Sequence, residues 1–124
     1  MMQKSEKTIE DYLEAMLMIQ EKKGNVRSID VAEQLGVKKP SVTYATKRLK
    51  EHGYITMDAD NRIALTDAGM EIAAATYERH KLLTKLFTML GVDEATAMED
   101  ACRVEHDISP ATYAALRKHL EQYE

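Results

Sequence analysis

A chain of 124 residues suits one compact unit or two small lobes with a shared core, and 44% hydrophobic but only 6% aromatic residues favour a mainly α fold over a β-sandwich. No apolar run approaches the roughly 20 residues that span a bilayer, and the N-terminus lacks the apolar core of a signal peptide, which predicts a cytoplasmic protein without a membrane partner. The net charge of −4 argues weakly against nucleic acid as a partner, and a single cysteine excludes an internal disulfide.

Three helices are predicted in the first part of the chain. The first spans residues 5–23 and stops at Gly24, because apolar side chains recur at helical spacing, namely Ile9, Tyr12, Leu13, Met16 and Leu17. Ser28 can cap the second helix, and Gly36 permits a tight turn after it. The third helix opens at Pro40 or Ser41 and ends before Gly53, with three inward side chains, Val42, Ala45 and Leu49. A helix, a glycine-containing turn and a second helix form a helix-turn-helix pattern.

The third helix carries most of a local basic segment. VKKPSVTYATKRLK, residues 37–50, holds five cations and no acid, so the rest of the chain is strongly acidic. A basic face on an acidic body is typical of a small DNA-binding module. At about 100° per residue, the side opposite Ala45 displays Lys39, Thr43, Lys47 and Lys50, with Tyr44 and Arg48 on the flank. The ordinary alternative for this face is a solvated lysine surface.

Two short β-prone runs follow, YITM at 54–57 and RIAL at 62–65, separated by the turn residues DADN. Two strands after a helix-turn-helix predict a winged helix. Asp58 and Asp60 surround a single Arg62, so we expect the third helix to dominate DNA affinity. The residues predicted to contact DNA are Lys38, Lys39, Ser41, Thr43, Tyr44, Lys47, Arg48, Lys50 and Arg62.

Three more helices are predicted in the second half. Thr66 caps a long helix that ends at Gly91 and has a length of about 36 Å, more than one small lobe requires. Asp93 begins a fifth helix, and Ser109 with Pro110 begins a sixth. We therefore expect a winged-helix DNA-binding domain over residues 1–72 and a helical domain over residues 73–124.

The fifth helix contains EDACRVEHDIS, residues 99–109, with the only cysteine of the chain. Helical spacing places Cys102, Glu105 and His106 on one face within a turn, so a thiolate, a carboxylate and an imidazole can converge on one point. Many helices carry such a triplet by chance. Cys102 is thus a metal ligand, a reactive thiol or a buried small hydrophobe.

Other helices offer further candidate ligands. Asp11 and Glu14 lie one turn apart on the first helix, on the face opposite its apolar stripe, and His80 occurs in ERHKLL on the long helix. Each has an ordinary interpretation. Two acids near a helix start are most often partners of the helix dipole, and a single histidine is most often a surface or hydrogen-bonded residue.

Together with the winged helix, these segments resemble the diphtheria toxin repressor family, also called iron-dependent repressors. The resemblance runs from IEDYLEAM through RHKLL to DACRVEH and covers nearly the whole chain. DACRVEHDIS is similar to the metal-binding helix of the iron type, and EDYLE to the first helix of manganese transport regulators. Thr84 and Met98 depart from the family pattern of a second, ancillary metal site. The resemblance is to the compact two-domain type.

The resemblance implies a homodimeric, metal-activated repressor of metal-uptake genes, whose second domain binds metal and dimerises. Its third helix would enter the major groove of a palindromic operator in double-stranded DNA. The activating ion would be Fe²⁺ or Mn²⁺, with Co²⁺, Zn²⁺ or Cd²⁺ able to bind in vitro. Carried over position by position, the ligands would be Asp11, Glu14, His80, Cys102, Glu105 and His106.

Two rival functions remain open. A metal-independent winged-helix regulator could use Cys102 as a redox switch, so that thiol oxidation would control DNA binding. A metallohydrolase could use the same ligand set. The sequence shows no α/β framework, no Gly-rich loop and no general base besides the ligands, so we expect no enzyme.

Overall fold

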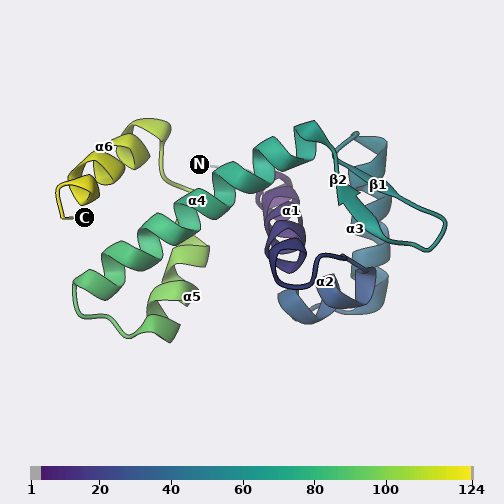
Figure 1. Cartoon of the computed structure of the whole chain (residues 1–124), viewed down its shortest axis with the longest axis horizontal. Coiled ribbons are helices and arrows are strands. Elements are labelled where there is room, and N and C mark those ends of the chain that lie inside the picture. Colours follow the sequence, from purple (N-terminus) through teal and green to yellow (C-terminus); the bar gives the residue numbers. More distant parts are fainter. Residues whose placement is uncertain (1–3, 124) are drawn as a thin grey trace. The chain divides into compact units, whose positions relative to one another are not determined.

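The computed structural model describes residues 4–123, with side chains from residue 6 onward. Over this range the chain forms helices and one β-hairpin, as predicted (Figure 1). The elements are α1 (Lys4–Lys23), α2 (Ser28–Leu35), α3 (Lys39–Glu51), β1 (Ile55–Met57), β2 (Ile63–Leu65), α4 (Asp67–Met89), α5 (Glu94–Val104) and α6 (Pro110–Glu121). Two compact units divide the described residues between positions 75 and 76, inside α4. None of the described helices has the length and apolar character needed to cross a membrane.

The N-terminal unit, residues 4–75, is built on three mutually packed helices. Helices α1, α2 and α3 pack on one another, β1 contacts α3, and β2 contacts α1. The backbone N–H of Ile63 donates to the Val26 carbonyl at 2.8 Å and ties the hairpin to the segment before α2. The side chains at the centre are buried and apolar: Leu13, Met16, Val31, Val42, Leu49, Ile55 and Ile63. This unit is the predicted winged helix.

The turn between α2 and α3 requires a glycine. Gly36 has φ of +66°, in the left-handed region, and its N–H donates to the Ala32 carbonyl. On α3 the predicted inward residues Val42 and Leu49 are buried, but Ala45 is only half-buried, and Thr46 is buried in addition. The Thr46 hydroxyl donates to the Thr43 carbonyl at 3.1 Å, which is how a polar residue is accommodated there.

The start of α2 differs from the prediction. Ser28 is the first helical residue and Arg27 is the N-cap, so the expected Ser28 cap is wrong. The Asp30 carboxylate accepts the Arg27 N–H at 3.1 Å and a Lys23 ammonium hydrogen at 2.8 Å. The hydrogen bond from Lys23 is the main cause that lowers the pKa of Asp30. The acid at the third helical position thus satisfies the backbone N–H of the N-cap residue, which is the part that an N3 carboxylate plays in a capping box.

The hairpin is antiparallel, and Ile55 pairs with Leu65 and Met57 with Ile63. After β2, Thr66 caps α4 as predicted, because its Oγ1 accepts the Gly69 N–H at 3.1 Å. The same hydroxyl donates to the Gly53 carbonyl at 2.6 Å. A Cβ at Gly69 would collide with the Tyr54 carbonyl oxygen, so the first turn of α4 packs directly on the backbone before β1.

The C-terminal unit, described from residue 76 to 123, contains the rest of α4 with α5 and α6. Asp93 accepts the Thr96 N–H and Ser109 accepts the Thr112 N–H, so both predicted caps are confirmed. The buried apolar side chains of the unit include Leu83, Ala97, Ala101 and Leu120. Helix α5 ends at Val104, with Glu105 as its C-cap. The prediction that this helix also carries His106 is wrong, because the chain leaves the helix one residue earlier.

Candidate metal centre and DNA-binding surface

Glu105 is the centre of a buried polar cluster in the C-terminal unit. Its carboxylate Oε2 lies 3.0 Å from His80 Nδ1, and its Oε1 lies 3.5 Å from His106 Nε2. Only 1% of Glu105, 8% of His80 and 3% of His106 is exposed. A carboxylate and two imidazoles this deeply buried are costly unless they pair with one another or hold a metal ion. The structure therefore brings together three of the predicted ligands.

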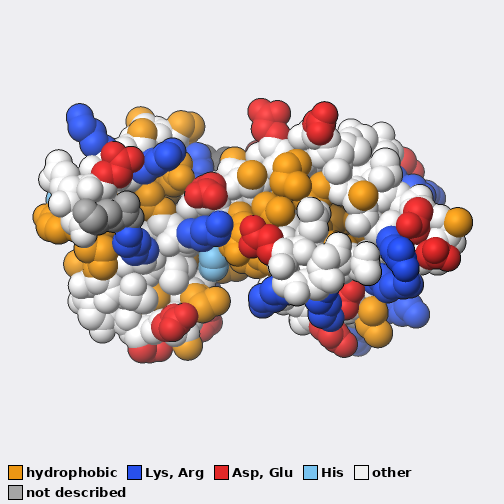
Figure 2. All heavy atoms as spheres, viewed as in Figure 1, with side chains coloured by type: hydrophobic (Ala, Val, Ile, Leu, Met, Phe, Trp, Pro, Cys, Tyr) orange, Lys and Arg blue, Asp and Glu red, His pale blue; other side chains and the backbone are white. Residues whose placement is uncertain are grey.

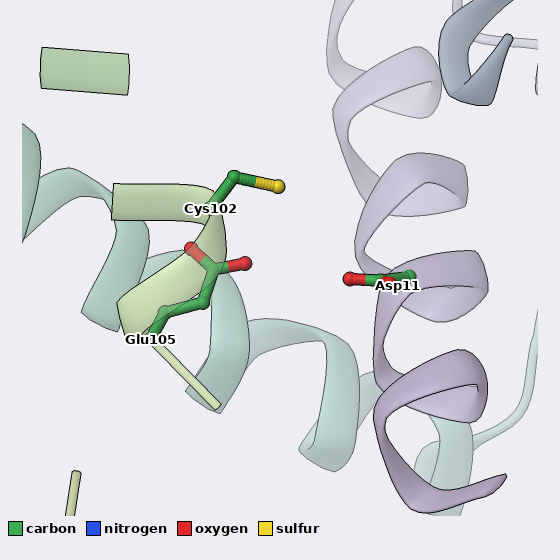
Figure 3. A group of neighbouring side chains, drawn as sticks. All are labelled: Asp11, Cys102 and Glu105. Atoms are coloured by element: carbon green, nitrogen blue, oxygen red, sulfur yellow. The ribbon is translucent and has the colours of Figure 1, made fainter. Parts of the chain in front are cut away.

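Cys102 lies beside this cluster. Its residue is exposed, and its Sγ lies within 4.8 Å of a Glu105 carboxylate oxygen. Figure 3 shows the two side chains near the C-terminal end of α5. The exposed position removes the interpretation of Cys102 as a buried small hydrophobe.

The remaining two candidates belong to α1 in the N-terminal unit. Glu14 is 4% exposed and Asp11 is half-buried. Figure 3 also draws Asp11, which projects sideways from α1. Glu14 is thus the more deeply buried of the two acids, and carboxylates are seldom this buried in proteins.

Arg79 is a polar neighbour of the cluster that sequence reasoning missed. Its Nη1 donates to the carbonyl oxygens of Glu105 at 3.3 Å and Ile108 at 2.7 Å. Its guanidinium also lies 5.3 Å from the centre of the Tyr113 ring. The only signal in the sequence was its place directly before His80.

The predicted DNA-contacting residues form an exposed surface on the N-terminal unit. All nine are exposed, and eight of them lie on α3 or immediately before it. Tyr44 is 65% exposed, with the Arg48 guanidinium 5.7 Å from its ring centre. Figure 2 shows Lys and Arg side chains in blue over the region of α3 and the hairpin. Such a surface offers ammonium groups to phosphates and short polar groups to base edges.

The hairpin contributes acids as well as cations. The Asp58 carboxylate accepts the backbone N–H groups of Asp60 and Arg62, both at 2.9 Å. The bond from Arg62 is the main cause that lowers the pKa of Asp58. Arg27, which the sequence did not single out, donates to the Asp60 carbonyl at 3.2 Å and adds a second cation near the wing. This contact joins positions 33 residues apart, so no local sequence pattern predicts it.

Comparison with protein families matches both parts of the chain. Residues 5–61 match the model of the iron dependent repressor, N-terminal DNA binding domain. Residues 66–124 match the model of the iron dependent repressor, metal binding and dimerisation domain.

Similar curated proteins are transcriptional regulators. An uncharacterized HTH-type transcriptional regulator of Methanocaldococcus jannaschii is 35% identical over 119 residues, covering 94% of either chain. The transcriptional regulator MntR of Escherichia coli O157:H7 is 33% identical over 115 residues, covering 93% of this chain and 74% of that protein. The HTH-type transcriptional regulator MntR of Bacillus subtilis is 34% identical over 102 residues, covering 82% of this chain and 72% of that protein.

Solved structures with the same fold include a manganese-dependent transcriptional repressor in complex with manganese. It superposes with a TM-score of 0.83 at 27% identity, covering 91% of this chain and 52% of that one. The IdeR of T. acidophilum superposes with a TM-score of 0.80, covering 90% of this chain and 53% of that one, and at 21% identity this likeness shows the fold alone. The chain thus spans about half the length of these solved proteins.

Proposed function

The chain belongs to the iron-dependent repressor family, so it is a metal-responsive DNA-binding regulator, and we propose that it represses metal-uptake genes as a homodimer activated by Fe²⁺ or Mn²⁺. One matched domain is described for DNA binding and the other for metal binding and dimerisation, which supports both halves of the proposal. It would act in the cytoplasm, where its DNA lies. The comparisons do not favour the alternative in which Cys102 is a redox switch. The similar curated proteins are regulators, and the proposal includes no catalytic step.

The observation that carries the proposal is the buried contact of Glu105 with His80 and His106. Carboxylate oxygen and imidazole nitrogen are ligands that Mn²⁺ and Fe²⁺ accept, so the donor set fits the ion that the family implies. When bound, a divalent ion would supply the positive charge that offsets the buried Glu105 carboxylate. The chain contributes donors that are already close together and shielded from water.

We assign six ligands in this proposal. Four come from the C-terminal unit, where the side chains are grouped, and two come from α1 on the strength of the resemblance of EDYLE. They are Asp11, Glu14, His80, Cys102, Glu105 and His106. The thiolate of Cys102 shifts preference toward softer ions such as Fe²⁺, Co²⁺ or Zn²⁺ relative to an all-oxygen-and-nitrogen site, and cellular availability leaves Fe²⁺ or Mn²⁺ as the working signal.

The N-terminal unit supplies the DNA-reading surface. Helix α3 would enter the major groove with Ser41, Thr43 and Tyr44 near base edges and its lysines on phosphates. A symmetric homodimer presents two such helices, so the operator would be palindromic with half-sites about one helical turn apart.

Residues of both units act together in this mechanism. With Asp11 and Glu14 of α1 and the C-terminal donors serving as ligands, the chain would be ordered before it meets DNA. Because bound metal orders the chain in advance, it lowers the entropic cost of DNA binding. Metal and DNA would therefore each strengthen the binding of the other. No large change of shape is required.

Elemental analysis combined with a gel-shift assay tests the proposal. The DNA is a duplex enriched by the protein from a random-sequence pool, separately in Mn²⁺ and in chelator. We expect bound metal, a shift in Mn²⁺ or anaerobic Fe²⁺, and loss of the shift in chelator. Glu105→Gln should lose metal-dependent binding, while the exposed Glu121→Gln serves as the matched control and should not.

The same assay separates the alternatives. DNA binding that ignores chelator but responds to diamide and dithiothreitol would support the thiol switch and overturn the proposal. A Glu105→Gln variant that still responds normally to metal would remove the buried cluster from the metal site.

A further inference from the structure

Arg79 holds the backbone from which two of the proposed ligands project. One nitrogen, Nη1, donates to the carbonyl of Glu105, the C-cap of α5, and to the carbonyl of Ile108 three residues later. The last carbonyls of a helix have no partner within the helix. Arg79 supplies that partner here, and it fixes the direction in which the chain leaves α5 through His106.

The guanidinium is itself fixed from a second side. It lies 5.3 Å from the centre of the Tyr113 ring on α6, and its own residue directly precedes His80 on α4. A planar group that donates to two carbonyls and rests on an aromatic ring has little freedom to move. The position of one side chain therefore links α4, the end of α5, and α6.

We propose that Arg79 is a positioning residue that orients Glu105 and His106 toward the metal site, an inference that rests on the metal site of the proposed function. Arg79 is not a ligand, since a guanidinium has no lone pair to donate at neutral pH. It acts through the main chain, by holding the two ligand-bearing residues at the angle at which Glu105 meets His80.

Charge alone makes the opposite prediction. A guanidinium close to a metal site repels a divalent cation, so removal of the charge would tighten metal binding if electrostatics dominated. If positioning dominates, removal weakens it, because the ligands lose their fixed orientation. Residues that orient metal ligands typically contribute about 10- to 100-fold to metal affinity.

The test compares Arg79→Met and Arg79→Lys in the full-length protein, with Co²⁺ and Mn²⁺ as the probes. We expect about 10- to 100-fold weaker binding for Arg79→Met and a smaller loss for Arg79→Lys, which keeps the charge and part of the donor capacity. The visible Co²⁺ bands should shift in Arg79→Met, because the geometry of the bound donors changes. Arg117→Met is the matched control, since Arg117 is exposed and pairs with Glu121 at 3.7 Å on α6.

A second variant covers the case in which Arg79→Met does not fold. Tyr113→Leu leaves both hydrogen bonds possible and removes only the ring beneath the guanidinium, so metal binding should weaken by a few fold. Unchanged or tighter metal binding by Arg79→Met, with an unshifted Co²⁺ spectrum, overturns the inference and leaves the metal site standing. A merely structural residue would lower the melting temperature without moving the spectrum, and that result also overturns it. If the wild-type protein binds neither Co²⁺ nor Mn²⁺, the proposed metal site is wrong, and the inference about Arg79 is wrong with it.

Discussion

Replacing Lys47 or Lys50 with alanine tests the assignment of α3 to DNA binding. Both side chains are exposed on α3, and neither ammonium has an ion-pair partner among the side chains described between residues 6 and 123. Alanine has the highest helix propensity, so the free energy of unfolding should change by no more than about 0.5 kcal/mol. Any effect on DNA affinity can then be attributed to the lost contact rather than to misfolding.

The expected size follows from counterion release. Each phosphate contact contributes about 0.9 to the slope of log affinity against log salt concentration. A homodimer loses the contact twice, so the slope should flatten by about 1.8. Between 50 and 200 mM salt, the fall in affinity should therefore be about tenfold smaller for the variant than for the wild type.

Fluorescence anisotropy with a labelled duplex at several salt concentrations and saturating metal measures this slope. Lys118→Ala on α6 is the matched control, because it removes the same charge from an exposed helical position in the other unit. Metal affinity should be unchanged in all three variants. Unaltered slopes in both Lys47→Ala and Lys50→Ala would remove α3 from the phosphate-contacting surface.

Three further predictions concern the thiol, the assembly and the packing of α4. Cys102→Glu should improve the activation of DNA binding by Mn²⁺ relative to Zn²⁺ or Co²⁺, because an oxygen ligand replaces sulfur, whereas Cys102→Ala should weaken activation by every metal. Two results together would rule out the thiolate ligand: a wild-type Co²⁺ protein that lacks a near-ultraviolet thiolate band, and a normal metal response of Cys102→Ala. The chain should be a homodimer by light scattering at micromolar concentration with or without metal, and a monomer would contradict this. The reason is that the matched dimerisation domain exposes two large apolar side chains, Met89 (49%) at the end of α4 and Leu90 (73%) directly after it. Gly69→Ala should lower the free energy of unfolding by about 1–3 kcal/mol, because its Cβ would meet the Tyr54 carbonyl. An ordinary helical Gly→Ala change is stabilising by about 1 kcal/mol, so a stabilised variant in thermal unfolding would refute that packing argument.

Local chemistry predicted most of the secondary structure. The caps at Thr66, Asp93 and Ser109 were correct, because each is a short polar side chain placed just before a helical segment. The cap of α2 was not, because the Asp30 carboxylate accepts the Arg27 N–H at the helix start and is held there by an ion pair with Lys23 at the end of α1. Such a contact between two helices lies beyond any local rule. The domain boundary between residues 72 and 73 stays a prediction.

The candidate site was less accessible to local patterns. Spacing on one helix grouped Cys102, Glu105 and His106, although the chain leaves that helix before His106. His80 lies 25 residues before Glu105, and only the family resemblance joined them in advance. The roles of Arg79 and Arg27 escaped prediction, since their partners are backbone carbonyls and those carry no residue signature.

The acidic tip of the hairpin bears on how the protein searches DNA. Asp58 is held by two backbone N–H groups and its pKa is lowered, so the tip keeps a fixed negative charge at neutral pH. A fixed negative charge repels phosphates, so it opposes the attraction that Arg62 and Arg27 exert on DNA from the same part of the unit. In the proposed complex the hairpin therefore adds little to non-specific affinity, and the cations of α3 supply most of it.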